Sequence, residues 1–161
     1  MVAELLIYLV TSFGYLGVFL SSLIGTATII FPVPSFFIIV FAGTVLNPLV
    51  VGIIGGIGAA IGEMTAYFAG YGGRAIINKK GKKHTKMFNR IEKLFNRYNG
   101  TAIVFLFAVT PLPDDFVGLF CGAIRFNAKK FFIASLAGKI ILYIFLAYAG
   151  FYGWDVINDF I

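Results

Sequence analysis

Residues 31–48 read FPVPSFFIIVFAGTVLNP, and this stretch decides which kind of fold the chain can adopt. Pro32 and Pro34 must interrupt a helix, because each lacks a backbone N–H and restricts the residue before it. The apolar run from Pro34 to Leu46 would be about 20 Å long as a helix, against about 30 Å for the hydrocarbon core of a bilayer. The sequence therefore predicts one limb of a re-entrant hairpin, which returns to the side from which it came.

The composition of the whole chain places this hairpin in lipid. Of the 161 residues, 60% are hydrophobic and only 12% are charged, whereas about a quarter of the residues of a soluble domain are charged. Most of the surface must therefore face lipid. We expect an all-α, polytopic integral membrane protein that forms a single membrane domain.

Two stretches are long enough to cross a bilayer unaided. Residues 48–73 and 128–150 each exceed the roughly 20 apolar residues that a spanning helix needs. The first is rich in glycine and alanine at helical spacing, which favours close approach of membrane helices. We expect Gly55 and Gly58 to pack against other helices rather than to contact a ligand.

The basic residues are concentrated in one segment. Residues 74–97 carry nine basic residues and one acid, a local charge of +8, whereas the whole chain carries +6. By the positive-inside rule this segment is cytoplasmic, and both termini then lie outside the cell membrane. Residues 83–98 alternate basic and apolar side chains with a helical period, which predicts an amphipathic helix on the cytoplasmic surface; a solvated loop helix is the alternative. The apolar flanks argue against nucleic-acid binding.

A second hairpin follows the basic segment. Residues 101–124 read TAIVFLFAVTPLPDDFVGLFCGAI, and Pro111 and Pro113 interrupt the stretch in its middle. These two prolines match Pro32 and Pro34, because both pairs are related by the same shift in residue number. We expect both proline pairs to form hairpin tips that meet near the middle of the membrane.

The two halves read as an inverted repeat. Gly70 and Gly150 are related by nearly the same shift as the prolines, as are Gly73 and Gly153 near the ends of the two long helices. If the basic segment is cytoplasmic, the helix at 48–73 enters the cytoplasm and the helix at 128–150 leaves it, so the halves have opposite orientations. Inverted repeats with broken helices are common in transporters. The expected division is repeat 1 at about 14–73, the basic segment at 74–99 and repeat 2 at about 100–153.

With these features in place, the sequence resembles the DedA family, also called the VTT or SNARE-associated Golgi protein family. The resemblance is carried by FPVPSFFIIVFAG, then GAAIGEMTAYFAGYGGR, then TPLPDDFVGLFCGAIRFNAKKFFIASLAGK. The middle string is similar to the family's Gly-acid-x-x-x-Tyr-x-x-Gly-Arg pattern through Gly62, Glu63, Tyr67 and Gly70. Arg74 is displaced by three residues from the family's arginine and joins the candidate site.

The resemblance implies two opposed re-entrant hairpins and the movement of lipids between leaflets. Bacterial members are implicated in recycling polyprenyl-phosphate carriers, and eukaryotic relatives scramble phospholipids. The chain also departs from the family: Ala27 and Phe36 stand near places where many bacterial members carry acids. Ala108 and Asp114 stand where many carry arginines around the second tip. This PLPDD form marks a small, divergent member, and it weakens the case for arginine-based recognition of a lipid phosphate.

Few ionisable groups fall at membrane depth, and each is a functional candidate because it is costly in lipid. Glu63 lies within the first spanning helix, Asp114 and Asp115 follow the second tip, and Lys139 lies three turns into the last helix. Arg125 lies just before the last helix and could reach the cytoplasmic entrance to this group of charges. Two interpretations stay open: these groups pair to hold the hairpin, or they form a site that binds protons or guides headgroups.

Three classes of function compete. The favoured class is a lipid translocator whose partners are membrane lipids, either phospholipid or polyprenyl phosphate, with proton linkage left open. A small-solute or ion transporter and an assembly factor without transport are the alternatives. An enzyme is not expected, because no nucleophile–base arrangement is recognisable. No cofactor or metal is expected either, since Cys121 is the single cysteine. A homo-oligomer stays open, because two spans leave a monomer little interior.

Overall fold

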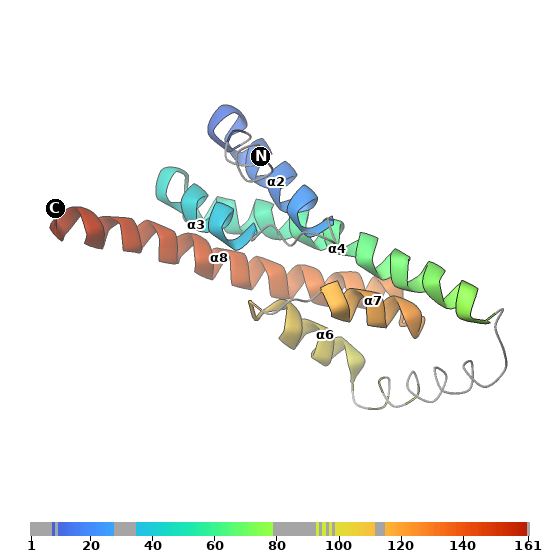
Figure 1. Cartoon of the computed structure of the whole chain (residues 1–161). Coiled ribbons are helices and arrows are strands. Elements are labelled where there is room, and N and C mark those ends of the chain that lie inside the picture. The colour runs from blue at the N-terminus through green and yellow to red at the C-terminus, as the bar shows by residue number, and fades with distance from the viewer. Residues whose placement is uncertain are drawn as a thin grey trace.

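The computed structural model describes residues 8, 10–27, 35–78, 93, 95, 97, 99–111 and 115–160 (Figure 1). The regular secondary structure of these residues is α-helical, in agreement with the expected all-α class. The helices are α2 (Tyr15–Ala27), α3 (Ser35–Val45), α4 (Pro48–Asn78), α6 (Gly100–Ala108), α7 (Asp115–Ala123) and α8 (Ala128–Phe160).

The two long helices, α4 and α8, run antiparallel through the centre of the molecule (Figure 1). The segments Pro48–Arg74 and Ala128–Gly153 are long and apolar enough to cross a bilayer. Both helices continue beyond the predicted ends at residues 73 and 150. A single glycine costs a helix only about 1 kcal/mol relative to alanine, so Gly73 and Gly150, at the predicted ends, do not end these helices.

Each long helix begins at an asparagine cap. The side-chain oxygen Oδ1 of Asn47 accepts hydrogen bonds from the backbone N–H groups of Leu49 and Val50, at 3.1 and 3.3 Å. Oδ1 of Asn127 accepts one from the N–H of Lys130 at 3.1 Å. Such caps satisfy N–H groups that have no partner within the helix. Asn47 and Asn127 are related by the same shift in residue number as Gly70 and Gly150, so equivalent caps start the two long helices.

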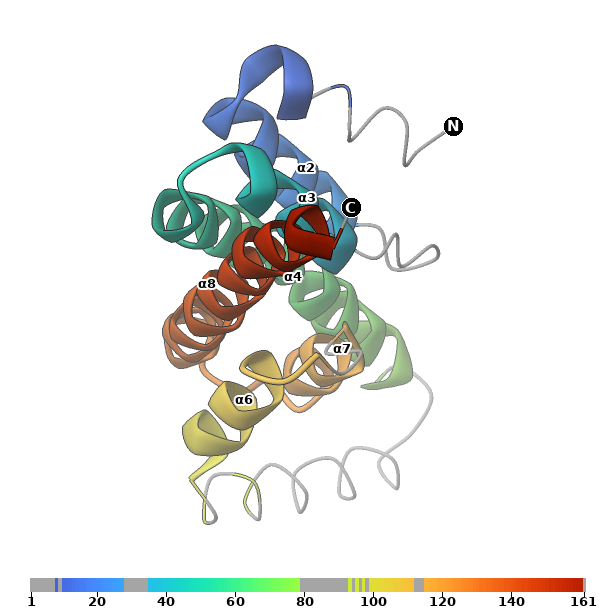
Figure 2. The ribbon, with the colours of Figure 1, turned by 90° about the vertical axis from the view of Figure 1, so that its left-hand side faces the viewer.

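The four short helices are too short to cross a bilayer. The longest of them, α2, has 13 residues, which is about 20 Å of helix. Figure 1 shows α2 and α3 extending from the middle of the molecule toward the C-terminal end of α8, and α6 and α7 extending toward the end where α8 begins. Figure 2 shows the two pairs on opposite sides of the long helices.

The hairpins exchange their second arms between the halves. In each half the first arm packs on its own long helix, α2 on α4 and α6 on α8. The second arm packs on the long helix of the other half, α3 on α8 and α7 on α4. The chain is therefore interlaced, and neither half could bury its hairpin without the other.

Glycines at this crossing let backbones touch. A methyl group on any of four glycines would overlap a carbonyl oxygen on the facing helix. The pairs are Gly43 with Ala147, Gly150 with Val40, Gly122 with Tyr67, and Gly70 with Leu119. The shift that relates the two halves converts the first two pairs into the last two, with the halves exchanged. Gly70 and Gly150, matched in the sequence by that shift, are therefore matched packing positions.

Glycine packing was also predicted for Gly55 and Gly58, and the contacts confirm it. A methyl group on Gly55 would meet the side chains of Ile39 and Tyr143, at 2.7 and 3.0 Å. One on Gly58 would meet the carbonyl oxygen of Phe19 at 2.5 Å. Both glycines therefore serve contact between helices.

Some predictions fall outside the described residues. Pro32, Pro34 and Pro113 are among them, so the predicted meeting of the two tips remains a prediction. Pro111 is described and lies exposed in the turn after α6. Only Lys93, Phe95 and Arg97 are described within the predicted amphipathic helix; the two basic residues are exposed and Phe95 stacks edge-on against Phe120 and Phe126.

Candidate functional site

Two matched stripes of buried residues face the interior of the molecule. On α4 the stripe takes every fourth residue from Val51 to Tyr67, and on α8 it takes every fourth residue from Phe131 to Ala147. Residues spaced by four lie on one face of a helix, and all ten are buried. The α4 stripe is Val51, Gly55, Ala59, Glu63 and Tyr67, and the α8 stripe is Phe131, Ser135, Lys139, Tyr143 and Ala147.

The stripes carry opposite charges. Glu63 and Lys139 are each only 1% exposed. A charge at such a depth is expensive unless it is paired. The two stripes meet where a methyl group on Gly55 would lie 3.0 Å from the ring of Tyr143. The sequence named Glu63 and Lys139 as candidates, and the structure places them on the facing surfaces of the two long helices.

The register of α4 and α8 brings these two side chains toward the same level. Gly52 packs against Ile144 and Gly56 against Ile140, which places Lys139 about 9 Å along the axis from Glu63. Helical side chains lean toward the N-terminus of their own helix. Because the helices are antiparallel, this general tendency inclines the two side chains toward one another, and the long stem of a lysine could span much of that distance.

Asp115 belongs to the same level. A methyl group on Gly118 would lie 3.1 Å from Cβ of Ala66, and Gly122 packs one turn farther along both helices, so α7 and α4 are parallel. Asp115 precedes Gly118 by three residues on the same face of α7, which places it level with Glu63. Asp115 is half-buried. Its neighbour Asp114 lies outside the described residues.

Buried hydroxyl groups extend this polar interior. Ser22 and Ser135 are at most 1% exposed, and in the described part of the chain neither hydroxyl has a hydrogen-bond partner. By contrast, the hydroxyl of Ser21 donates to the carbonyl oxygen of Gly17 at 2.6 Å. Buried polar atoms are normally satisfied, so these two hydroxyls are available to a polar group that enters the interior. Sequence reasoning missed them, because serine is common in membrane helices; only their place on buried faces marks them.

The remaining motif residues tie α4 to the end of α7. The hydroxyl of Tyr67 donates a hydrogen bond to the carbonyl oxygen of Phe126. Nη1 of Arg74 donates to the carbonyl oxygen of Ala123 at 3.0 Å. A cation at a helix C-terminus stabilises its unpaired carbonyl groups. Tyr67 and Arg74, two turns apart on one face of α4, therefore hold the turn between α7 and α8.

Arg125 does not join the buried charges. It is exposed and has φ 56°, the left-handed conformation that ends many helices. Its N–H donates to the carbonyl oxygen of Gly122 at 3.0 Å, and the N–H of Phe126 donates to that of Cys121 at 2.9 Å. Its guanidinium lies 5.1 Å from the centre of the Tyr71 ring, a cation–π arrangement.

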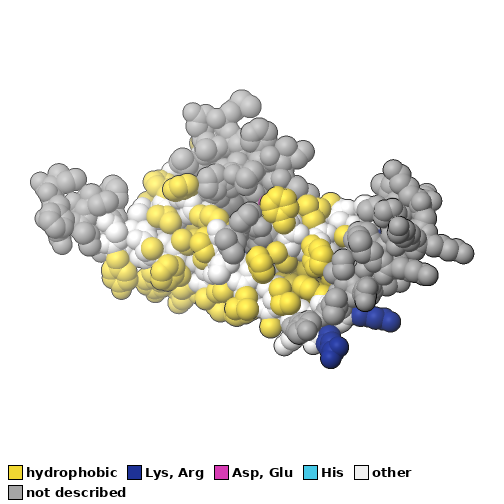
Figure 3. All heavy atoms as spheres, turned by 60° about the horizontal axis from the view of Figure 1, so that its bottom comes forward, with side chains coloured by type: hydrophobic (Ala, Val, Ile, Leu, Met, Phe, Trp, Pro, Cys, Tyr) yellow, Lys and Arg dark blue, Asp and Glu magenta, His cyan; other side chains and the backbone are white. Residues whose placement is uncertain are grey.

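The site therefore divides into two parts. Asp115 lies level with Glu63 in the interior, and Lys139 lies about 9 Å along the axis from Glu63. Arg74 and Arg125 lie at the basic end of the molecule. Exposed lysine and arginine side chains gather at that end (Figure 3). Among the described residues, no group of three or more His, Cys, Asp or Glu side chains could hold a metal ion.

Comparison with known proteins gives one family match. A family model described as the VTT domain matches residues 33–152, which is well over half of the chain. The match covers both long-helix segments, the second hairpin and the buried charges. Neither the curated proteins nor the solved structures contain a match to the chain.

Proposed function

The chain belongs to the VTT domain family, and from this membership we propose that it moves lipids between the two leaflets of a membrane. Two apolar helices that could each cross a bilayer support a membrane location. The substrates we propose are phospholipids or a polyprenyl phosphate. The observation that carries the proposal is the pair of fully buried, oppositely charged residues, Glu63 and Lys139, on the facing stripes of the two long helices.

The topology we propose is an inverted repeat of two re-entrant hairpins. Its support is the set of glycine contacts that recur, with the halves exchanged, in the two parts of the chain. The basic end of the molecule, with exposed Lys129 and Lys130 at the start of α8, faces the cytoplasm by the positive-inside rule. Both termini then lie outside.

This orientation has a direct test. A cysteine placed at Lys82, with Cys121 replaced by serine, should react with an impermeant maleimide only from the cytoplasmic side. Reaction from the outside in intact cells would reverse the proposed topology. A variant with Cys121 replaced and no added cysteine gives the background labelling.

The short hairpin arms and the buried charges suggest how a headgroup crosses. A charge in the middle of a lipid bilayer costs several kcal/mol, and this cost is what slows lipid exchange between leaflets. Arms that end near mid-depth leave polar backbone where lipid tails would otherwise lie. Lys139 would attract the phosphate of a headgroup, and Glu63 would restore neutrality at that site once the phosphate has left. The two unpartnered hydroxyls, of Ser22 and Ser135, would offer hydrogen bonds along the way.

The proposal is tested by lipid exchange in reconstituted vesicles. Purified protein should accelerate the transfer of a fluorescent anionic phospholipid or of a polyprenyl phosphate between leaflets. Lys139→Gln should lower that rate at least tenfold, because it removes the buried cation. Lys130→Gln is the matched control: it removes a lysine from the same helix at an exposed position, and it should leave the rate within about twofold. Wild-type protein that accelerates neither lipid would refute the proposed function.

The same vesicles distinguish the alternatives. A small-solute or ion transporter would pass solute while leaving lipid asymmetry intact. An assembly factor would do neither. Acceleration that depends on the headgroup favours lipid transport over both.

Proton linkage is a second part of the proposal. Asp115 shares a level with Glu63, and like charges in a buried site disfavour simultaneous ionisation. Proton binding by this group of carboxylates would couple lipid movement to pH. Asp114 belongs to the same test, because it precedes Asp115 directly in the chain.

A further inference from the structure

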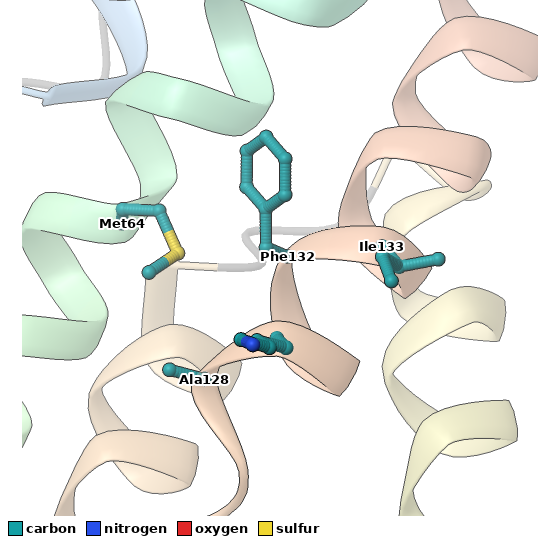
Figure 4. Close-up of a pocket in the computed structure, with 5 residues that line it drawn as sticks. Met64, Ala128, Phe132 and Ile133 are labelled. Atoms are coloured by element: carbon teal, nitrogen blue, oxygen red, sulfur yellow. The ribbon is translucent and has the colours of Figure 1, made fainter.

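A pocket opens on the outer surface of the long-helix pair, at the basic end of the molecule. Its volume is about 310 Å³, and it is lined by Met64, Ala128, Lys129, Phe132 and Ile133. Figure 4 shows Met64 from α4 and Ala128 and Phe132 from the first turns of α8 around the gap between the two helices. The pocket is separate from the buried stripes, because none of its five residues belongs to them.

The walls of the pocket suit a hydrocarbon chain. Every lining residue except Lys129 is apolar. Met64 and Ala128 pack against the buried core cluster of Tyr67 and Phe131, so this part of the wall rests on well-packed side chains. Methionine adapts to irregular apolar partners. The volume is at the small end for ligand pockets, which fits part of one acyl chain and not a whole lipid.

The charge at the rim suits an anionic headgroup. Lys129 is exposed and lies in the first turn of α8, about 6 Å along the axis from Ile133. Lys129 is the cation that lines the pocket; Lys130 and Arg125, close to it in the chain, are also exposed. A positive rim above an apolar pocket, at the level where a spanning helix begins, matches a lipid with its headgroup at the interface and its chain in the bilayer.

We propose that this pocket holds one acyl chain of an anionic phospholipid and that Lys129 binds the phosphate of this lipid. The lipid belongs to the leaflet at the basic end of the molecule. The inference rests on the membrane location of the chain and not on transport. Lipid binding at the pocket can therefore be tested independently of lipid exchange. The lipid docks from the side, outside the polar interior.

The experiment uses a tryptophan placed in the pocket. Trp154 is the single tryptophan, so Trp154→Phe removes the tryptophan fluorescence of the protein. Phe132→Trp in this background then places one fluorescent tryptophan in the pocket. In vesicles, phosphatidylglycerol with brominated chains should quench this tryptophan more strongly than brominated phosphatidylcholine. Lys129→Gln should reduce that preference about fivefold, the effect of one lysine near a charged lipid.

Two controls make the result specific. Phe145→Trp in the same background places a tryptophan on α8 at a position that is 71% exposed and outside the pocket, and it should be quenched equally by both lipids. Lys130→Gln removes an adjacent exposed lysine and should leave most of the preference. Equal quenching of the pocket tryptophan by the two lipids, or a preference that survives Lys129→Gln, would overturn the proposal. If Phe132→Trp fails to fold, retention of phosphatidylglycerol by the wild type and by Lys129→Gln in native mass spectrometry decides the same question.

Discussion

Replacing Gly70 by alanine should destabilise the protein, whereas the same replacement at Gly72, two residues away on α4, should not. A methyl group on Gly70 would overlap the carbonyl oxygen of Leu119 on α7, but one on Gly72 has no atom within 4 Å. The two substitutions add the same atom to the same helix. They differ only in whether a second backbone occupies the space.

The magnitude follows from two opposing terms. Alanine improves helix propensity by about 1 kcal/mol at either site. Forcing a methyl group into a packed contact costs about 1–3 kcal/mol, and the cost at Gly70 falls at the top of that range because the obstacle is backbone and cannot rotate away. Gly70→Ala should therefore lose about 2 kcal/mol, and Gly72→Ala should gain up to about 1 kcal/mol.

The measurement is thermal unfolding in detergent, followed by circular dichroism or by aggregation of the unfolded chain. For a chain of this length, about 2 kcal/mol corresponds to a shift in melting temperature of about 4–8 °C. The repeat supplies an independent copy of the experiment. Gly150, which packs on the carbonyl oxygen of Val40, should behave as Gly70 does, and Gly153, which has open space, should behave as Gly72 does. Equal stability of Gly70→Ala and Gly72→Ala would show that α7 does not lie on α4 as described.

Three further predictions concern the site. Glu63→Gln and Lys139→Gln should each cost about 3–5 kcal/mol of unfolding free energy if the two buried opposite charges interact, since each variant then leaves one charge unbalanced. The double variant should cost less than the sum of the single losses, as measured by a double-mutant cycle. Additive losses would mean that the two side chains do not interact. Tyr67→Phe should lose about 1–2 kcal/mol in thermal unfolding, with the exposed Tyr71→Phe as the unaffected control, and equal stability of the two variants would contradict the hydrogen bond to the end of α7. At least one of Asp114→Asn and Asp115→Asn should abolish the pH dependence of lipid exchange in vesicles, and if both keep the wild-type pH profile the carboxylates are structural.

The starts of α3 and α7 agree with the sequence prediction, because each helix begins within two residues of a P-x-P pair. An apolar run broken by P-x-P cannot continue as one helix, and the short arms α3 and α7 follow directly from the positions of the prolines. The class of protein follows from composition in the same way. These features can be predicted without knowing the tertiary contacts, because proline acts through its own backbone and composition is a property of the sequence alone.

The exchange of arms between the halves could not be predicted. A glycine within a helical stretch can be a helix end, a packing contact or neither, and only the facing backbone decides among these. Gly150 was therefore predicted as a helix end and proved to be a packing contact, as did Gly70, its match in the other half. The motif around Tyr67 and Arg74 has the same character: its spacing is visible in the sequence, but its partners, the carbonyl groups after α7, become known only from the fold.

The buried charges suggest a functional role, because buried charged residues usually stabilise a protein no better than apolar residues would. A pair such as Glu63 and Lys139 loses hydration on both sides, and well-packed apolar residues of the same size usually stabilise a core as much or more. A comparison of matched positions in the two halves of the chain supports the same conclusion. The shift that relates Gly70 to Gly150 also relates Glu63 to Tyr143 and Ala59 to Lys139, and both Tyr143 and Ala59 are buried and uncharged. The architecture thus builds the same position twice, once with a charge and once without, so the fold itself does not require the charge. Under the proposed function, Glu63 and Lys139 would provide a polar point in the middle of an apolar molecule, where a lipid headgroup could cross.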